Sequence, residues 1–120
     1  MSKTVGFIGY PNVGKTYLFN RISACNGCVG NWSGVTATCQ KTQKNTKDLE
    51  LSYMDLPGCY YLPDKKIDPE QPESIRNIQK ALYQDQIDVW VNVVDVKYLA
   101  QQLMLTLTLI EQKRRVILVL

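Results

Sequence analysis

The stretch GYPNVGKT at positions 9–16 constrains this chain more than any other feature. It matches the pattern G-x-x-x-x-G-K-[ST] in full. The apolar run at 5–8 before it is typical of a buried strand, and the segment at 17–22 after it is typical of a helix. A strand, a glycine-rich turn and a helix in this order form a phosphate-binding loop. An ordinary glycine-rich turn explains the order, but not the Lys-Thr pair that closes it.

The residue types in this loop suit phosphate chemistry. Gly9 and Gly14 let the backbone curl so that successive N–H groups surround phosphate oxygens. Lys15 can place its charge on the β- and γ-phosphates, and Thr16 can offer a hydroxyl to Mg²⁺. The helix that starts here adds its positive end to the same site. The predicted phosphate-binding residues are Gly9, Tyr10, Pro11, Asn12, Val13, Gly14, Lys15 and Thr16.

The whole chain alternates strand-like and helix-like segments. Strands are predicted at 4–9, 36–46, 49–54, 89–94 and 116–120, helices at 15–24, 73–84 and 99–112, and loops at 26–33 and 55–72. The expected apolar helix faces are Leu18, Phe19 and Ile22, then Ile75, Ile78 and Leu82, then Leu99, Leu103, Leu107 and Ile110. This alternation predicts an α/β fold with a mainly parallel sheet and helices on both faces.

Composition limits the class of protein. The 120 residues suffice for one domain, and 45% hydrophobic with 21% charged residues indicate a globular chain. A net charge of +3 with scattered lysines gives no argument for nucleic acid. We find neither a signal peptide nor an apolar run of roughly 18 residues, so we expect a soluble, cytoplasmic chain. The chain has no histidine, which removes Ser-His-Asp triads and histidine metal sites.

The four cysteines leave two interpretations open. Cys25 and Cys28 have the C-x-x-C spacing of metal and redox sites, but Cys39 and Cys59 do not form a second such pair. A thiolate metal site at Cys25 and Cys28 is one interpretation. The other, which we favour for a cytosolic chain, is four reduced thiols without a special role.

A second phosphate element follows about 40 residues after the loop. Asp55-Leu56-Pro57-Gly58 is a D-x-x-G segment at the end of a predicted strand. Asp55 can hold Mg²⁺ through water, and Gly58 can turn its N–H to a γ-phosphate. A Pro-Gly turn that closes a strand explains the geometry of Pro57 and Gly58 whether or not a nucleotide binds. Thr36, which lies between the two elements, is the expected second Mg²⁺ ligand.

These motifs carry a resemblance to a known family. The segments at 9–20, 29–36 and 55–62, together with 91–95 and the helix that follows, resemble the GTP-binding domain of FeoB-type ferrous iron transporters. The string GNWSGVT at 30–36 is the most family-specific part, and the resemblance covers nearly the whole chain. Assembly GTPases share the loop and the D-x-x-G segment but not usually that string, so a stand-alone assembly GTPase is the weaker alternative.

The resemblance implies a Ras-like GTPase domain that binds GTP or GDP with Mg²⁺ and K⁺. It implies that Asn12 helps to coordinate K⁺, with backbone carbonyls near Asn31 and Trp32, and that this K⁺ replaces an arginine finger. The implied catalytic residues are Asn12, Lys15 and Thr36, and the implied metal-binding residues are Thr16, Thr36, Asp55 and Asn12. The implied switch segments are Gly34, Val35, Thr36, Ala37 and Thr38, and then Asp55, Leu56, Pro57 and Gly58.

The resemblance also implies a partner and a location. The partner is the membrane domain of the transporter, in a longer chain or in trans, and it would hold the chain at the cytoplasmic side of the membrane. Oligomers are left open. Cys59 stands where Ras-type enzymes carry a water-orienting glutamine, so we expect slow hydrolysis that depends on bound ions and backbone groups.

One expected motif is not found. An Asn-Lys-x-Asp-like segment reads the guanine base after the strand at 116–120, and the sequence has none there. We therefore expect a C-terminally incomplete domain, with an apolar edge strand and exposed helix faces. A fragment, a truncated reading frame and a chain that needs a partner are the alternatives. A non-catalytic remnant that retains phosphate contacts without turnover is the alternative function.

Overall fold

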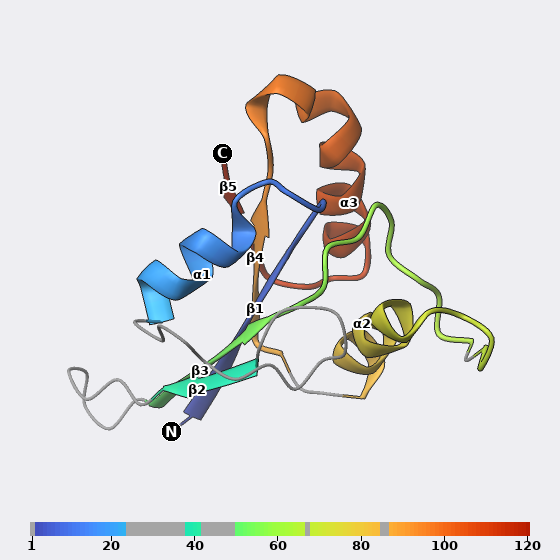
Figure 1. Cartoon of the computed structure of the whole chain (residues 1–120), viewed down its shortest axis with the longest axis horizontal. Coiled ribbons are helices and arrows are strands. Elements are labelled where there is room, and N and C mark those ends of the chain that lie inside the picture. Colours follow the sequence, from blue (N-terminus) through green and yellow to red (C-terminus); the bar gives the residue numbers. More distant parts are fainter. Residues whose placement is uncertain (1, 24–37, 42–49, 67, 85–86) are drawn as a thin grey trace.

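A computed structural model describes residues 2–23, 38–41, 50–66, 68–84 and 87–120 (Figure 1). Its strands are β1 (Ser2–Gly9), β2 (Thr38–Lys41), β3 (Glu50–Asp55), β4 (Val89–Val93) and β5 (Val116–Val119). Its helices are α1 (Lys15–Ser23), α2 (Glu73–Tyr83) and α3 (Leu99–Glu111), with the short 3-10 helix η1 (Val96–Tyr98) directly before α3. The predicted alternation of strands and helices is therefore confirmed. Of the predicted strand at 36–46, residues 38–41 form β2, and its other residues lie outside the described ones.

The five strands form one sheet in the order β2-β3-β1-β4-β5. β2 is antiparallel to β3, and the other pairs are parallel. The strand β1 lies in the middle, with Phe7 opposite Asp55 on β3 and Gly9 opposite Val93 on β4. The chain runs to one side of β1 for β2 and β3 and to the other side for β4 and β5. The carboxyl end of β1 is thus the point where the winding reverses, which is where open α/β sheets place their ligands.

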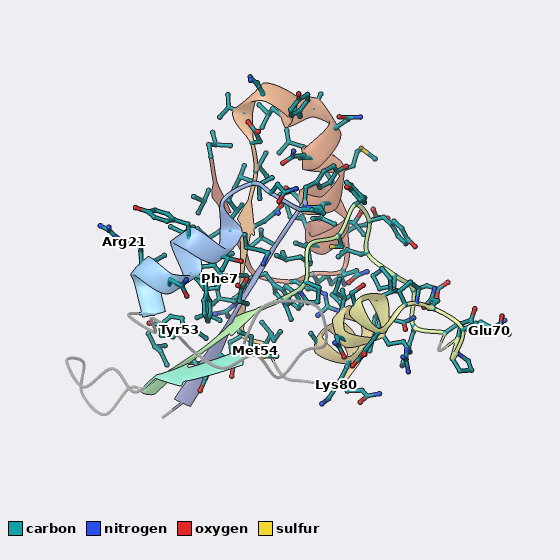
Figure 2. All side chains as sticks on the ribbon, in the orientation of Figure 1. Phe7, Arg21, Tyr53, Met54, Glu70 and Lys80 are labelled. Carbon is teal, nitrogen blue, oxygen red and sulfur yellow. The ribbon has the colours of Figure 1, made fainter. Side chains whose placement is uncertain are left out.

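Helices cover both faces of the sheet, as the sequence predicted. On one face Phe19 of α1 packs edge-to-face on Phe7, with ring centroids 5.4 Å apart, and Tyr53 lies 6.5 Å from Phe7. Figure 2 shows Phe7 and Tyr53 between α1 and the sheet, while Arg21 points away from the sheet. On the other face α2 and α3 enclose a second core around Ile8 and Trp90. Ile22, expected on the apolar face of α1, is 45% exposed, so that part of the prediction is wrong.

The predicted apolar face of α3 is also wrong in part. Leu107 and Ile110 were expected in the core, but each is 54% exposed. The buried apolar residues are Leu105 and Leu109 instead. Leucine, isoleucine and methionine occur all around this helix, so an apolar pattern of period 3.6 does not select one face.

Two polar residues decide which face of α3 is buried. Gln102 accepts a hydrogen bond from the backbone N–H of Asp95 at 2.8 Å, and the Thr106 hydroxyl donates to the side-chain oxygen of Asn92. Asn92, on β4, in turn donates to the backbone carbonyl of Ile8 at 3.2 Å. Buried polar groups are tolerated when they are hydrogen-bonded. The polar partners of Asp95 and Asn92 therefore fix the rotation of α3 about its axis.

The segment between β3 and α2 contains no helix or strand in its described residues, as predicted for a loop. It is nevertheless fastened to α2. The amide of Gln79 donates to the carbonyls of Asp64 and Lys66 at 2.9 and 2.8 Å, and the Tyr83 hydroxyl donates to that of Pro63 at 3.0 Å.

The strand β5 lies at the end of the sheet and is mostly exposed. Ile117 is 54% and Leu118 is 40% exposed, which agrees with the apolar edge expected there. Among the helices that the structure describes, none is both long and apolar enough to cross a bilayer.

Candidate functional site

The loop between β1 and α1 has the backbone that its sequence predicts. Asn12 has φ 65° and Gly14 has φ 88°, both in the left-handed region. Glycine and asparagine adopt this region at the least cost, and a side chain at position 14 would be strained although nothing lies within 4 Å of it. The Gly14 carbonyl accepts the hydrogen bond from Leu18 N–H at 3.0 Å, so the turn runs directly into α1.

The D-x-x-G segment packs directly against this loop. A Cβ atom on Gly58 would lie 2.8 Å from Cα and 2.9 Å from the backbone nitrogen of Pro11, so only glycine fits there. Two backbone hydrogen bonds hold the segment along β1, one from Leu56 N–H to the Phe7 carbonyl at 3.1 Å and one from Cys59 N–H to the Gly9 carbonyl at 3.0 Å. The two motifs that are distant in sequence thus form a single structure at the carboxyl end of β1.

Lys15 and Asp55 form a buried ion pair at the centre of this structure. The Lys15 ammonium, on the first residue of α1, contacts Oδ1 of Asp55, on the last residue of β3. The side chains are 6% and 1% exposed. A buried charge is stable only with a partner, so each residue holds the other in place. A phosphate group that takes the Lys15 ammonium must therefore compete with the Asp55 carboxylate.

The Cys59 thiol is buried within reach of the Lys15 charge and is unreactive at neutral pH. Burial raises its pKa from 9.0 to about 12, and the nearby Lys15 charge offsets only part of this effect. At neutral pH the thiol is therefore protonated and can serve neither as a base nor as a thiolate nucleophile. It packs in the core between the sheet and α2, as a small hydrophobic residue would.

A pocket of about 330 Å³ opens over the loop. Its other wall is formed by Pro57 and Gly58, and Tyr17 adds an exposed ring that the sequence analysis did not assign to the site. The position of Tyr17 directly after Thr16 is the sequence signal that could have assigned it to the site. Arg21 lies over the Tyr17 ring, 5.9 Å from the centroid. From the phosphate loop, six predicted residues line the pocket: Tyr10, Pro11, Asn12, Gly14, Lys15 and Thr16.

Some of the remaining predicted residues lie in the described part of the chain, and the others lie outside it. Among the described residues, Gly9 lies against the Val93 carbonyl, Val13 is partly buried against the core around Phe7, and Leu56 is fully buried. Thr38 begins β2. The other predicted switch residues, Gly34, Val35, Thr36 and Ala37, lie outside the described residues, as do Cys25, Cys28, Asn31 and Trp32.

The oxygen groups at the site suit a hard cation. Thr16 lines the pocket, and the buried Asp55 carboxylate contacts the ammonium of Lys15, which also lines it. Hydroxyl and carboxylate oxygens are the donors that Mg²⁺ prefers. The residues that the structure describes include no group of three or more Cys, Asp or Glu side chains placed to hold a metal. A cation here would thus rely on phosphate oxygens and water in addition to these two residues.

The sheet topology, the loop at the switch point and the acidic end of the neighbouring strand define a P-loop nucleotide-binding domain. A family model described as Ferrous iron transport protein B matches residues 3–120. The chain therefore belongs to the FeoB family. It is 39% identical over 108 residues to the Fe(2+) transporter FeoB of Shigella flexneri and to that of Escherichia coli (strain K12). Each match covers 90% of this chain and 14% of the relative, so the chain spans a small part of their length.

Solved structures of the same family have the same fold. The FeoB G-domain from Methanococcus jannaschii is 31% identical with a TM-score of 0.68, covering 98% of this chain and 66% of that one. The cytosolic domain of T. maritima FeoB in apo form is 32% identical with a TM-score of 0.73, covering 98% and 44%. NFeoB of S. thermophilus bound to GDP and AlF4⁻ is 38% identical with a TM-score of 0.69, covering 97% and 43%. The predicted family and fold class are confirmed.

Proposed function

We propose that this chain is the nucleotide-binding part of a ferrous iron transporter, which binds guanine nucleotides with Mg²⁺ and hydrolyses GTP slowly. The observation that carries the proposal is the joint placement of the phosphate loop, Lys15 and Asp55 at one end of β1. The relatives from S. thermophilus were solved with GDP and with mGMPPNP, which supports the choice of guanine nucleotide.

Binding begins with the exchange of partners at Lys15. The Lys15 ammonium leaves Asp55 and moves to the β- and γ-phosphates, while the loop N–H groups and the start of α1 surround the phosphate oxygens. The freed Asp55 carboxylate, through water, and the Thr16 hydroxyl would hold Mg²⁺. When bound, Mg²⁺ and K⁺ supply positive charge to the phosphates as the terminal bond breaks. Asn12 is proposed to help hold the K⁺, and Thr36 to complete the Mg²⁺ shell.

Slow turnover follows from Cys59. Its thiol is buried and protonated, so it cannot orient or deprotonate the attacking water. Hydrolysis then relies on Gly58 N–H, Thr36 and the bound ions. The same observation favours a second candidate function, a nucleotide-binding module without useful turnover. In either case we propose that the nucleotide state is passed to the membrane domain of the transporter at the cytoplasmic face.

Fluorescence titration tests the proposal directly. Labelled GDP and ADP analogues are titrated into the chain with Mg²⁺, in K⁺ and then in Na⁺. We expect Lys15→Ala to weaken GDP binding by on the order of 100-fold or more, because two or more charge-assisted contacts are lost. Lys80→Ala, an exposed lysine on α2 (Figure 2), is the matched control and should bind as the native chain does.

The titration also separates the alternatives. GDP affinity that survives in Lys15→Ala would remove the phosphate-loop assignment. Equal affinity for GDP and ADP would remove guanine selectivity from this chain. Release of phosphate from GTP that is faster in K⁺ than in Na⁺, and that loses this difference in Asn12→Ala, supports hydrolysis over simple binding.

A further inference from the structure

A second cavity lies beside the phosphate loop, on the side of α3. It has a volume of about 450 Å³ and is lined by three tyrosine rings, one carboxylate and two glutamine amides. Tyr10 comes from the phosphate loop, Tyr60 from the segment after β3, and Asp95 and Tyr98 from the residues that lead into α3. In Figure 1 this segment after β3 runs past α3 near the end of β1. Its residues from the phosphate loop also belong to the proposed nucleotide site, whereas Tyr60, Asp95, Tyr98 and the two glutamines have no part in the proposed nucleotide chemistry.

The tyrosine rings leave aromatic surface open to a ligand. Tyr10 and Tyr60 pack edge-to-face with centroids 5.0 Å apart and an interplanar angle of 81°, and the Tyr10 hydroxyl donates to the Gln101 carbonyl at 3.4 Å. Tyr60 is nevertheless 64% exposed and Tyr98 55% exposed. Large aromatic side chains gathered at a cavity mouth in this way are typical of surfaces that bind something.

Asp95 supplies the only ionised side chain among the described residues that line the cavity. Its position is fixed on two sides. Its Oδ1 accepts the Lys97 N–H at 3.0 Å, and its own N–H donates to the buried Gln102 side chain at 2.8 Å. The carboxylate is therefore held in place before any ligand arrives, which lowers the cost of binding.

Aromatic faces around one fixed carboxylate are complementary to a planar cation. A guanidinium group stacks on tyrosine rings, pairs with a carboxylate and donates to amide and backbone oxygens, all of which this cavity offers. We propose that the cavity binds an arginine side chain of a partner protein. A protein side chain fits better than free arginine because the described residues that line the cavity include no cation for an α-carboxylate. Exposed Tyr61 and Val96, which follow Tyr60 and Asp95 in the chain, extend the apolar surface that a protein would cover.

The cavity is coupled to the phosphate pocket through shared residues. Tyr10, Pro11 and Asn12 line both, and Tyr60 follows two residues after Gly58, which packs on Pro11. Beside these shared residues, Lys15 is paired with Asp55. A ligand that stabilises this arrangement opposes the exchange of partners at Lys15, so arginine and nucleotide weaken each other's binding. This second part rests on the proposed function, whereas binding of arginine does not.

An NMR titration of the whole chain tests the proposal. The ligand is arginine blocked as its N-acetyl, N-methylamide derivative, and the neutral control is the same derivative of citrulline. We expect the arginine derivative to shift the resonances of Tyr60, Tyr98 and Gln101, and the citrulline derivative to leave them unchanged. Tyr98→Ala and Asp95→Asn should each weaken arginine binding by about 10-fold, because they remove one stacking face or the charge.

Coupling is then measured as the affinity for labelled GDP with Mg²⁺ at saturating blocked arginine. We expect an affinity about 5-fold lower, with the same factor for arginine when GDP is saturating, because coupling is reciprocal. Tyr98→Ala should bind GDP normally without arginine and show no such change. Equal binding of the citrulline derivative, absence of shifts, or free arginine that binds more tightly than the blocked form would overturn the assignment. An unchanged GDP affinity would overturn the coupling, and failure of GDP to bind without arginine would count against the proposed function alone.

Discussion

In the described part of the chain, two buried polar pairs join a helix to the sheet, and they differ in the partners that each can exchange. Thr106 and Asn92 link α3 to β4, and Asn92 also donates to the Ile8 carbonyl, so this neutral pair is satisfied within the protein. Lys15 and Asp55 link α1 to β3 through opposite charges beside an open pocket. The neutral pair has no better partner to find, whereas the charged pair can exchange its partners for phosphate and a metal. The first pair therefore fixes structure, and the second is suited to function.

The largest expected effect comes from breaking the neutral pair. Asn92→Ala removes two buried hydrogen bonds, leaves the Ile8 carbonyl without its donor and opens a cavity, so we expect a loss of about 3 kcal/mol in the free energy of unfolding. Urea unfolding followed by circular dichroism measures it. The GDP affinity of the molecules that remain folded should not change. A loss of affinity at unchanged stability would contradict the structural role of Asn92.

A smaller effect, of the opposite kind, is expected from the charged pair. Asp55→Asn leaves Lys15 without its competing carboxylate, so GDP should bind several-fold more tightly in EDTA, while Mg²⁺ should improve binding less than in the native chain. We expect the ratio of affinities with and without Mg²⁺ to fall by about 10-fold, or about 1.4 kcal/mol. Labelled GDP titrations measure it, with the exposed Glu70→Gln (Figure 2) as the control. An unchanged ratio would mean that Asp55 does not help to hold Mg²⁺.

Cys59 gives a pH-dependent test of the core that contains Ile8 and Leu56. Its pKa is raised from 9.0 to about 12 by burial, so the folded chain keeps a proton that the unfolded chain releases. The stability that the thiol contributes is complete below pH 9 and is lost as the pH rises toward 12. Between pH 9 and 10 the native chain should lose about 1 kcal/mol more than Cys59→Ala. Equal losses in urea unfolding at the two pH values would mean that the thiol is accessible to water.

The smallest expected effect is that of a substitution at Leu107 on α3. Leu107→Gln should change the free energy of unfolding by less than about 0.5 kcal/mol, because this side chain is 54% exposed. Leu109→Ala, two residues further along and fully buried, should cost about 3 kcal/mol. Comparable losses in the two variants would mean that α3 is rotated relative to the sheet from the position that Gln102 and Thr106 give it.

The phosphate loop was predictable because its causes are local. The left-handed backbone at Gly14 and the start of a helix at Lys15 follow from neighbouring residue types, and an acidic strand end after a fixed interval limits where Asp55 can lie. The face of α3 was not predictable in this way. The rotation of α3 depends on two hydrogen bonds, from Thr106 to Asn92 and from the Asp95 N–H to Gln102. These partners are 14 and 7 residues apart in the sequence, and a pattern of apolar residues does not reveal them.

The cavity lined by the three tyrosines could not be predicted either, because its residues are far apart in the sequence. Tyr10, Tyr60 and Tyr98 are separated by about 40 to 50 residues, and nothing in their spacing marks them as neighbours. They meet because β1 is bordered by β3 on one side and β4 on the other, so the segments that follow these strands arrive at the same edge of the sheet. The place of Tyr17 in the wall of the phosphate pocket was not predicted, because the phosphate-loop pattern ends at Thr16.

The Lys15–Asp55 pair has a consequence for the rate at which nucleotide arrives. A free lysine in an empty phosphate loop would attract a triphosphate from a distance, and salt would slow the encounter. Here the Lys15 charge is offset by a carboxylate in direct contact, so Lys15 adds little to the field that a distant anion meets. Capture is then governed by how often the pair opens rather than by how often nucleotide collides with it. The association rate of this chain should therefore depend only weakly on ionic strength.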